Sequence, residues 1–463
     1  MINVKASLEA VLGAGKVSAS EADLIETSHD SWPLSSKLRM INSHDYKADI
    51  VVYASDEEDI CNVLNIASDT KTPVTVRALA SSVTGQPLPT KGGIVLDVAN
   101  LEKSYSINKS NMTVEVSAGY NGGELEDILQ NLGYTTGHSP QSLYRSSVGG
   151  WLSTLATGQF SSYYGGIEHL ITSYEVILIS GQKVKLKANP RAAMGPDLRQ
   201  VFIGAEGTLG VVTSVTMKIF ELPEKRIYQT ALFPTVEDGL NAMREITHKG
   251  LAPFLLRFYD NDEAKHAMGD LYQGSPAMFL GSQGLEAIAE VEMKEVLNIC
   301  EKHGATQYNP EPVNRWLEKR FDFSKVENLL AQTGGYAETI EIAHNWDQIS
   351  GLYDDLRSAL LDMSDHVLSH FSHVYPQGTS MYIIVLGNKE NDVQAVELLE
   401  SIWKKVMGIC LEHGAELSHH HGGGLARSKY AKESIGSGHV VLQKLKTALD
   451  PDNLLNPGKL GLE

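Results

Sequence analysis

The sequence predicts an α+β protein with two domains and a C-terminal segment. Its 463 residues are too many for one ordinary hydrophobic core. Residues 49–116 alternate short β-rich runs with one amphipathic helix, which is typical of an α/β module. From residue 226 onward, β-rich runs alternate with helices, which predicts an antiparallel sheet with helices on one face. We expect a first domain at 1–223, a second at 224–415 and a C-terminal segment at 416–463.

Local patterns predict the elements of the first domain in order. Residues 1–45 are expected to be helical and then irregular, and Trp32-Pro33 ends the helical stretch. A helix is predicted at 56–70, which begins at an acidic cap, and another at 123–136. Residues 138–166 are rich in Gly and Ser and predict loops with one short helix. The predicted strands are "DIVVYAS" (49–55), "TPVTVRA" (72–78), "GGIVLDVANL" (92–101), "MTVEVSAG" (112–119), "ITSYEVILISGQKVKLK" (171–187) and a last strand before Pro223.

The second domain and the tail follow from similar patterns. Its predicted strands include "IYQTALFP" (227–234), "FLLRFYD" (254–260) and "AMFLGSQG" (277–284), separated by helices such as "TVEDGLNAMREITHKG" (235–250). The tail "SIGSGHVVLQKLKTALDPDNLLNPGKL" (434–460) predicts a helix and an extended end. We expect this end to pack back on the first domain.

Composition excludes several classes of function. A net charge of −18 opposes binding to nucleic acid. The three cysteines are far apart and have no CxxC spacing, which argues against a disulfide framework or a metal–thiolate site. No segment approaches 18 apolar residues, and the first residues lack the pattern of a signal peptide. We therefore expect a cytoplasmic protein without an integral membrane segment.

The stretch "SHHHGGG" (418–424) is a candidate for proton transfer or metal binding, because His titrates near neutral pH and is a common metal ligand. Consecutive side chains diverge in both strands and helices, and the run contains no acid, so we expect no metal here. A metal held by His419 and His421 with His370 or His373 is the alternative. We predict instead that one or two of His419, His420 and His421, most of all His420 or His421, supply general acid–base chemistry while the others orient them. A third interpretation is that they only cap a helix at the glycines.

Common nucleotide, zinc and esterase motifs are absent, since the chain has no GxxxxGK[ST], GxGxxG, HExxH or GxSxG. Four stretches rich in small residues remain. Such turns let backbone N–H groups approach an anion, and several together can hold a large phosphorylated cofactor. The stretches are "RALASSVTGQP" (77–87), "GHSPQSLYRSSVGGWLSTLATGQ" (137–159), "SSYYGGIEHL" (161–170) and "GAEGTLGVVT" (204–213).

These stretches, in this order, resemble the vanillyl-alcohol-oxidase (PCMH-type) family of FAD-binding flavoenzymes. The likeness runs from about residue 48 to the end and includes "ETIEIAHNWDQI", "LSHHHGGGLARSKY" and "DPDNLLNPGKL". It is closest to alkyldihydroxyacetonephosphate synthase and next to the D-2-hydroxy-acid (D-lactate and glycolate) dehydrogenases. The resemblance implies a two-subdomain PCMH-type FAD-binding domain, with its core at about 46–222, and a substrate (cap) domain over the flavin.

The resemblance also implies non-covalent FAD held by backbone groups of the loop after Arg77. Relatives carry glycines where this chain has Ala78-Leu79-Ala80, and a Cβ at a position with positive φ costs roughly 1 kcal/mol. Either the loop takes an ordinary φ, or it is re-formed around the phosphates, or flavin affinity is reduced. The implied cofactor-binding residues are Arg77, Ala78, Leu79, Ala80, Ser81, Ser82, Val83, Ser139, Pro140, Ser142, Ser147, Val148, Gly149, Gly150, Ala156, Gly158, Tyr164, Gly165, Ile167, Glu206, Gly207, Val211 and Val212.

On the substrate side, the resemblance places an anion-binding arginine at Arg257 and a proton-transferring tyrosine at Tyr382. A guanidinium suits an anion because it offers a planar, bidentate donor. Glu206 is expected to be a turn or flavin-loop residue. We expect charge clusters such as "LEKRFDF" (317–323) to be solvated helix faces.

Two reactions fit these residues. In the first, a histidine deprotonates the hydroxyl of a small anionic substrate, a 2-hydroxy acid or phosphorylated polyol, while FAD takes a hydride. In the second, a synthase-type enzyme exchanges acyl for alkyl on a dihydroxyacetone-phosphate ester without net oxidation. The short segment between Asp260 and Pro276 leaves little chain for a fatty-alcohol tunnel and favours the first. A non-catalytic flavin-binding protein is a third interpretation; the electron acceptor and a homodimer stay open.

Overall fold

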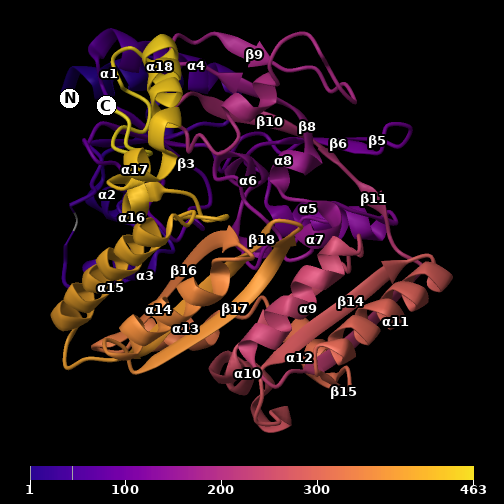
Figure 1. Cartoon of the computed structure of the whole chain (residues 1–463). Coiled ribbons are helices and arrows are strands. Elements are labelled where there is room, and N and C mark those ends of the chain that lie inside the picture. The colour runs from indigo at the N-terminus through magenta and orange to yellow at the C-terminus, as the bar shows by residue number, and fades with distance from the viewer. Residues whose placement is uncertain (1, 44) are drawn as a thin grey trace.

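The computed structural model describes residues 2–43 and 45–463 and has two α+β bodies, with the C-terminal residues running along both (Figure 1). The first body contains a four-stranded sheet in the order β1-β2-β4-β3. Strands β2 (Ile50–Tyr53), β4 (Ile94–Asp97) and β3 (Val74–Arg77) are parallel, and β1 (Val17–Ser18) is antiparallel to β2. Helix α4 (Glu57–Thr70) links β2 to β3, and Asp56 caps it by accepting the N–H of Asp59.

A second, antiparallel sheet in the first body has the order β5-β6-β10-β8-β9. Its strands are β5 (Tyr105–Asn108), β6 (Thr113–Ser117), β10 (Val211–Lys218), β8 (Ile171–Ile177) and β9 (Lys183–Lys185). Strands β7 (Tyr134–Thr135) and β11 (Phe220–Glu221) form a separate pair. The helices of this part are α5 (Gly122–Asn131), α6 (Val148–Ser153), α7 (Ser161–Tyr164) and α8 (Ile167–Leu170), with short 3-10 turns η2 (Leu143–Arg145) and η3 (Leu198–Val201).

The N-terminal residues contain more helix than the sequence predicts. Helix α1 (Ile2–Leu12), turn η1 (Ala14–Lys16) and helix α2 (Glu21–Glu26) come first. Residues beyond Pro33, which we expected to be irregular, instead form α3 (Pro33–Met40). Proline at the first helical position explains the error, because its fixed φ suits a helix start and its missing N–H costs nothing there. Pro33 therefore begins a helix.

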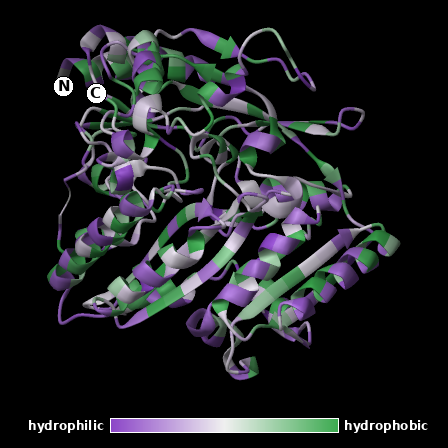
Figure 2. Ribbon diagram, viewed as in Figure 1, coloured by the Kyte–Doolittle hydropathy of each residue, from purple (hydrophilic) through white to green (hydrophobic). Residues whose placement is uncertain are grey.

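The second body is built on one antiparallel sheet of seven strands in the order β15-β12-β14-β13-β17-β18-β16. The strands are β12 (Lys225–Leu232), β13 (Leu255–Tyr259), β14 (Ala277–Gly284), β15 (Thr306–Tyr308), β16 (Gly335–Asn345), β17 (His366–Tyr375) and β18 (Gly378–Asn388). The long helices, which form one apolar core with one sheet face, are α9 (Val236–His248), α11 (Glu286–Lys302), α14 (Ile349–Leu361) and α15 (Asp392–His413). In Figure 2 these helices carry both hydrophilic and hydrophobic residues, as expected when one side is buried.

The opposite face of this sheet lies against the first body. A smaller apolar cluster there joins Phe279 of β14 to helices α10 (Asn261–Met268) and α12 (Glu311–Lys319) and to Phe160 of the first body. Helix α13 (Ser324–Leu330) and turn η4 (Gly269–Leu271) complete the connections. The polar side chains of this inner face are therefore buried between the two bodies.

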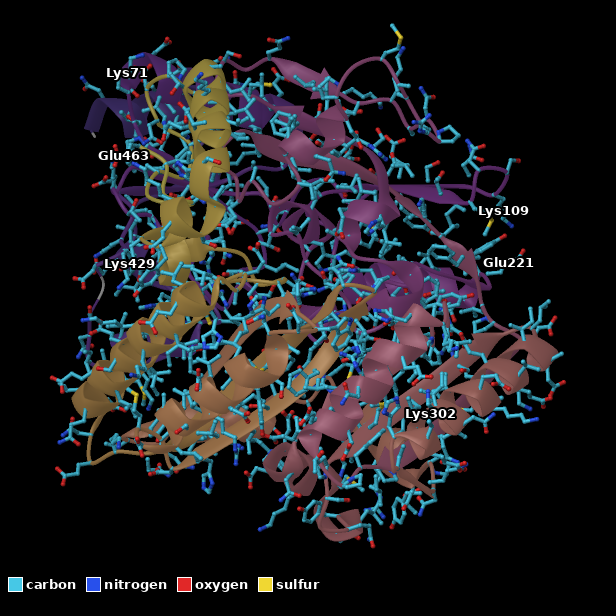
Figure 3. The ribbon with its side chains drawn as sticks, in the orientation of Figure 1. Lys71, Lys109, Glu221, Lys302, Lys429 and Glu463 are labelled. Carbon is cyan, nitrogen blue, oxygen red and sulfur yellow. The ribbon has the colours of Figure 1, made fainter. Side chains whose placement is uncertain are left out.

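The C-terminal segment contains α16 (Gly424–Ser428), α17 (Ala431–Ile435), turn η5 (Gly436–Gly438) and α18 (His439–Leu449). Beyond α18 the chain returns to the first sheet, where Leu455 forms a parallel bridge with Val74 and joins the core under β3. Charged side chains such as Lys71, Lys109 and Lys302 project at the periphery (Figure 3). None of the helices in the described ranges has the length and apolar character needed to cross a membrane.

Candidate active site between the two bodies

A row of polar side chains crosses four neighbouring strands on the inner face of the large sheet. Tyr259 of β13 pairs with His370 of β17, His370 pairs with Tyr382 of β18, and Tyr382 pairs with Glu341 of β16. Opposed residues point to the same face of a sheet, so these four side chains share one face. Their neighbours Phe258, Phe371, Met381 and Ile342 point the other way, into the main core.

Arg257 lies on this face, two residues before Tyr259. Its Nε donates to the Tyr259 hydroxyl at 2.7 Å, one Nη donates to Gln159 Oε1 at 2.8 Å, and the other lies 3.2 Å from His370 Nδ1. A guanidinium has five N–H groups, so two remain for a ligand. Gln159 belongs to the first body, which places Arg257 at the boundary between the bodies.

A buried acid accompanies Arg257. Glu263 of α10 has both carboxylate oxygens 2.8 Å from His370 Nδ1 and one oxygen 3.8 Å from Arg257. Burial raises the pKa of the Glu263 carboxyl to about 7, although Arg257 opposes this rise. Burial and the Arg257 charge hold the pKa of His370 well below its usual range. The Arg257 charge is therefore only partly neutralised near neutral pH.

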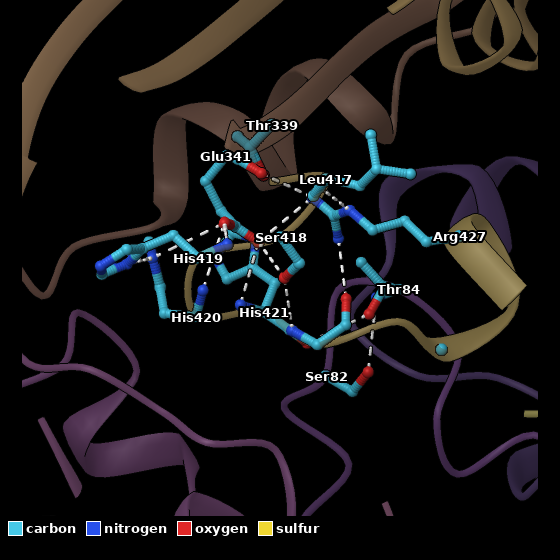
Figure 4. Close-up of polar contacts among 12 residues, drawn as sticks. Ser82, Thr84, Thr339, Glu341, Leu417, Ser418, His419, His420, His421 and Arg427 are labelled. Atoms are coloured by element: carbon cyan, nitrogen blue, oxygen red, sulfur yellow. Dashed lines mark hydrogen bonds and ion pairs between the residues drawn. The ribbon is translucent and has the colours of Figure 1, made fainter. Parts of the chain in front are cut away.

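The histidine run is a tight turn built around Glu341 (Figure 4). The backbone N–H groups of His419, His420 and His421 all donate to this carboxylate, the last two at 3.2 and 3.0 Å. The Ser418 hydroxyl donates at 2.9 Å, and Arg427 lies 3.1 Å away as an ion pair. Burial alone would raise the pKa of Glu341, but Arg427 and the histidines hold it well below its usual range. Glu341 is therefore an anion at neutral pH.

The three imidazoles are largely buried, with small exposed fractions of 13% for His420 and 15% for His421, and they are neutral. Burial lowers the pKa of His419 and His420 to about 3 and that of His421 to about 4, while Glu341 opposes each shift. The rings of His420 and His421 lie 6.0 and 5.5 Å from the Tyr382 ring. Burial raises the pKa of the Tyr382 phenol above its usual range. The structure thus brings His420 and His421 close to Tyr382, with His419 next to them in the same turn.

The same turn is tied to the first body. The His421 carbonyl accepts from Gln86 Nε2 at 2.6 Å and from the Thr84 hydroxyl at 3.3 Å. Glu206 accepts the N–H of Gly423 at 2.5 Å and of Gly424 at 3.0 Å, and burial raises the pKa of its carboxyl. Glu206 is therefore a turn residue that joins two loops.

Three ring nitrogens of the cluster could meet a metal ion. One ligand atom from each of His373, His419 and His420 lies within 4.8 Å of the others. The pair that converges is thus His419 with His420, whereas the sequence-based alternative paired His419 with His421. Existing contacts occupy part of this set, since His373 Nδ1 lies 2.8 Å from the Ser161 hydroxyl and His419 Nε2 lies 2.7 Å from the Tyr375 hydroxyl.

The loop of residues 78–83 fits a phosphate group. Among the residues the structure describes, the backbone N–H groups of 79–83 donate to no protein acceptor, which leaves them available to an anion. Ala80 has φ 48°, whereas Ala78 and Leu79 are outside the positive-φ region. The loop therefore keeps one left-handed position despite its Cβ. Of the three possibilities raised by the sequence, an ordinary φ throughout the loop is wrong.

The other proposed cofactor segments line the first body near this loop. Neither ring nitrogen of the buried His138, next to Ser139, has a hydrogen-bond partner within the described residues, and such an unpaired group suits a site completed by a cofactor. A Cβ on Gly158 would lie 2.4 Å from the Ser139 nitrogen, so the segments pack closely. Partly exposed are Ser139, Ser142, Gly150, Ala156, Tyr164, Gly165 and Gly207, whereas Pro140, Ser147, Val148, Gly149, Gly158, Ile167, Glu206, Val211 and Val212 are buried.

Sequence reasoning missed four residues of the site. Glu341 and Glu263 are acids inside apolar patterns, which is a usable signal because buried acids need partners. Gln159 ends a Gly-rich stretch and gives no signal. Arg320 corrects an expectation: the "LEKRFDF" cluster was predicted to be solvated, but Arg320 is only 7% exposed. The end of α12 turns this one side chain inward.

Comparison with known proteins identifies the family of the chain. Residues 222–460 match the model of the C-terminal domain of FAD-linked oxidases, and residues 48–187 match an FAD-binding domain. The chain is 28% identical to the FAD-linked oxidoreductase YgcU of Escherichia coli (strain K12), covering 98% of this chain and 97% of that protein. It is 25% identical to alkyldihydroxyacetonephosphate synthase of Dictyostelium discoideum, covering 89% and 73%. It is 24% identical to a mitochondrial D-lactate dehydrogenase of Arabidopsis thaliana, covering 89% and 73%.

The fold is likewise that of a known group. The structure superposes on p-cresol methylhydroxylase with a TM-score of 0.83, at 15% identity, over all of this chain and 97% of that one. This likeness confirms the predicted α+β, PCMH-type architecture. FAD is the cofactor that the matched domains and relatives support. The chain belongs to the family of FAD-linked oxidases.

Proposed function

We propose that this FAD-linked oxidoreductase dehydrogenates a small anionic hydroxy substrate, either a 2-hydroxy acid or a phosphorylated polyol. The observation that carries the proposal is the row Tyr259–His370–Tyr382–Glu341 on the face turned to the first body, with Arg257 at one end and the histidine turn at the other. An anion clamp and neutral proton acceptors thus lie on one surface.

Arg257 would bind the carboxylate or phosphate with its two remaining N–H groups. His421 would accept the hydroxyl proton, because its buried Nδ1 has no hydrogen-bond partner among the described residues and lies 3.6 Å from Glu341. The Glu341 anion stabilises the imidazolium that forms. His420 and Tyr382 would orient the ring and the substrate. When bound, FAD supplies the acceptor for the hydride, and the loop of residues 78–83 would hold its pyrophosphate.

The synthase-type exchange of acyl for alkyl is the second candidate, supported by the likeness to alkyldihydroxyacetonephosphate synthase. One experiment separates the two. The holoenzyme is mixed anaerobically with D-lactate, glycolate or a glycerol phosphate, and the flavin absorbance near 450 nm is followed. Bleaching supports dehydrogenation. Acyl exchange on a dihydroxyacetone-phosphate ester without bleaching supports the synthase reaction. If neither bleaching nor acyl exchange is observed, the non-catalytic flavin-binding alternative remains.

The proton acceptor has its own test. H421Q should slow anaerobic flavin reduction by about 100-fold or more while FAD content stays unchanged, because general-base groups contribute about this much. His413→Gln is the matched control, since His413 ends α15 and pairs with Asp355 outside the site. The wild-type rate should fall only as the pH approaches about 4, where the pKa of His421 lies. A rate that persists in H421Q would exclude His421 as the base.

A further inference from the structure

Arg320, at the end of α12, is a buried cation that pairs with no acidic side chain among the described residues. Its two Nη atoms donate to Ser139, one to the hydroxyl at 3.1 Å and the other to the carbonyl at 2.7 Å. Its Nε is buried and has no hydrogen-bond partner within the part of the chain that the structure describes. Burial and the nearby Arg257 charge lower the pKa of Arg320 to about 9. An unpaired buried charge is costly, so such a group calls for an anion.

Arg320 and Arg257 lie around one aromatic ring. The guanidinium carbons are 5.1 and 5.5 Å from the centroid of the Trp316 ring. The Arg320 guanidinium also lies 5.2 Å from the Phe160 ring and 4.7 Å from the Phe321 ring. Trp316 and Phe321 are partly exposed, which leaves this aromatic wall accessible. The two cations therefore belong to one site at the body boundary.

Gln159 contacts Arg257 with its side chain and Ser139, the partner of Arg320, with its backbone N–H. Its Oε1 accepts from Arg257 at 2.8 Å, while its Nε2 is buried without a hydrogen-bond partner among the described residues. Two buried donors, Arg320 Nε and Gln159 Nε2, thus lack acceptors in the same region. Neutral water could satisfy hydrogen bonds here, but only an anion would also balance the second positive charge.

We propose that Arg320 and Gln159 bind a second anionic group of the substrate, so that the site selects hydroxy acids with two anionic groups. The inference rests on the proposed function, because Arg257 binds the first anionic group. A dicarboxylic or a phosphorylated 2-hydroxy acid has the required chemistry. The cofactor phosphates are assigned to the loop of residues 78–83, and the hydrogen bonds of both arginines within the described residues go to partners outside that loop.

Succinate and butyrate test this subsite without turnover. Both have four carbons, and only succinate carries a second carboxylate. Titration of the holoenzyme, followed by the change in the flavin spectrum, should give succinate an affinity about tenfold higher or more, as expected for a charge-assisted pair in a buried site. R320M should abolish this preference and leave FAD content unchanged. Arg315→Met is the matched control, because Arg315 lies on the same helix but pairs with Glu311 and Asp270.

Three results would overturn the proposal: equal affinities in the wild type, equal weakening of both acids in R320M, or loss of FAD from R320M, which would give Arg320 to the cofactor. If R320M does not fold, R320K keeps the charge but loses the planar donor. It should reduce the succinate preference several-fold, and an unchanged preference would refute the assignment. Flavin bleaching by D-malate and by D-lactate tests the proposed function separately. If the holoenzyme prefers succinate but neither hydroxy acid bleaches the flavin, the dehydrogenation is rejected and the anion subsite is retained.

Discussion

Ala80 has φ 48° in the loop that we assign to the cofactor phosphates. A Cβ in the left-handed region costs about 1–2 kcal/mol for residues other than glycine. Among the described residues, the five N–H groups of residues 79–83 have no protein acceptor, so the strained residue lies in a loop whose donors are available to an anion. Strain at Ala80 is thus found in the loop that we propose for the cofactor phosphates.

Replacing Ala80 by glycine should relieve this strain. A80G is expected to change the free energy of unfolding by between zero and about +1 kcal/mol, since the lost strain exceeds or matches the added chain entropy. A78G is the matched control: Ala78 is outside the positive-φ region, so glycine there should destabilise by about 0.5–1 kcal/mol. Chemical denaturation measures both, and equal destabilisation of the two variants would contradict the strain at Ala80.

Arg257 gives a second prediction for a single residue. R257M should weaken binding of anionic substrates by about tenfold or more, because it removes the guanidinium at the end of the polar row, and FAD content should stay unchanged. Arg244→Met, on helix α9 against the other sheet face, should have no effect on substrate binding. Titration of the flavin spectrum with D-lactate measures the change. Loss of flavin with unchanged substrate affinity would show that the anion clamp is assigned wrongly.

At the scale of elements, the site depends on how strands and a turn meet. The turn of residues 418–424 is held by Glu341 on strand β16 and by Glu206 on the loop before β10. One carboxylate belongs to each body, and both accept backbone N–H groups of the same turn. The turn is therefore fixed by charge-assisted hydrogen bonds at both ends.

Removing the Glu341 charge should loosen this turn. E341Q is expected to lower the free energy of unfolding by about 3 kcal/mol or more, because Arg427 is left without its buried anion. The pKa of the Glu341 carboxyl is lower in the folded protein than its unfolded value of 4.5. The Glu341 anion therefore stabilises the fold when the pH is above 4.5, and this contribution is lost as the pH falls below that value. The gap between wild type and E341Q should narrow below about pH 4.5. Glu416→Gln, an exposed neighbour, is the control in pH-dependent denaturation.

The sequence predicted the individual helices and strands better than the tertiary contacts between them. Local periodicity indicated the strands around Arg257 and Tyr382, and a resemblance to known flavoenzymes indicated the histidines and the flavin loops. The row that joins them depends on strand register between separate segments, above all between Tyr259 and His370, which lie 111 positions apart in the sequence. Local patterns contain no information on that register. For the same reason the inward turn of Arg320, which depends on Ser139, could not be predicted.

For the whole molecule, a buried acid joins three distant segments. Glu338 of β16 accepts the indole N–H of Trp32 at 3.0 Å and that of Trp403 at 2.9 Å. Trp32 precedes α3, and Trp403 lies on α15. Burial raises the pKa of the Glu338 carboxyl to about 8. The contact between the N-terminal helices and the second body therefore depends on a proton.

This proton makes global stability depend on pH. The pKa of the Glu338 carboxyl is higher in the folded protein than its unfolded value of 4.5. Protonated Glu338 therefore stabilises the fold fully when the pH is below 4.5, and this contribution is lost as the pH rises through about 8. The free energy of unfolding of E338Q should fall less steeply between these pH values than that of the wild type, by several kcal/mol in total. Exposed Glu412→Gln should keep the wild-type slope. Identical slopes in wild type and E338Q would refute the role of this proton.

The bridge between Val74 and Leu455 also constrains the order in which the nascent chain can fold during translation. Asn456 Nδ2, beside it, donates to the carbonyls of Gln86 and Glu206 at 3.1 and 2.6 Å. A ribosome must therefore translate the entire second body before the strand that begins at Val74 gains its last neighbour. A nascent chain cannot complete the support beneath the loop of residues 78–83 until then. If the loop of residues 78–83 holds the flavin as we propose, chains interrupted before Leu455 should bind flavin less tightly and remain colourless.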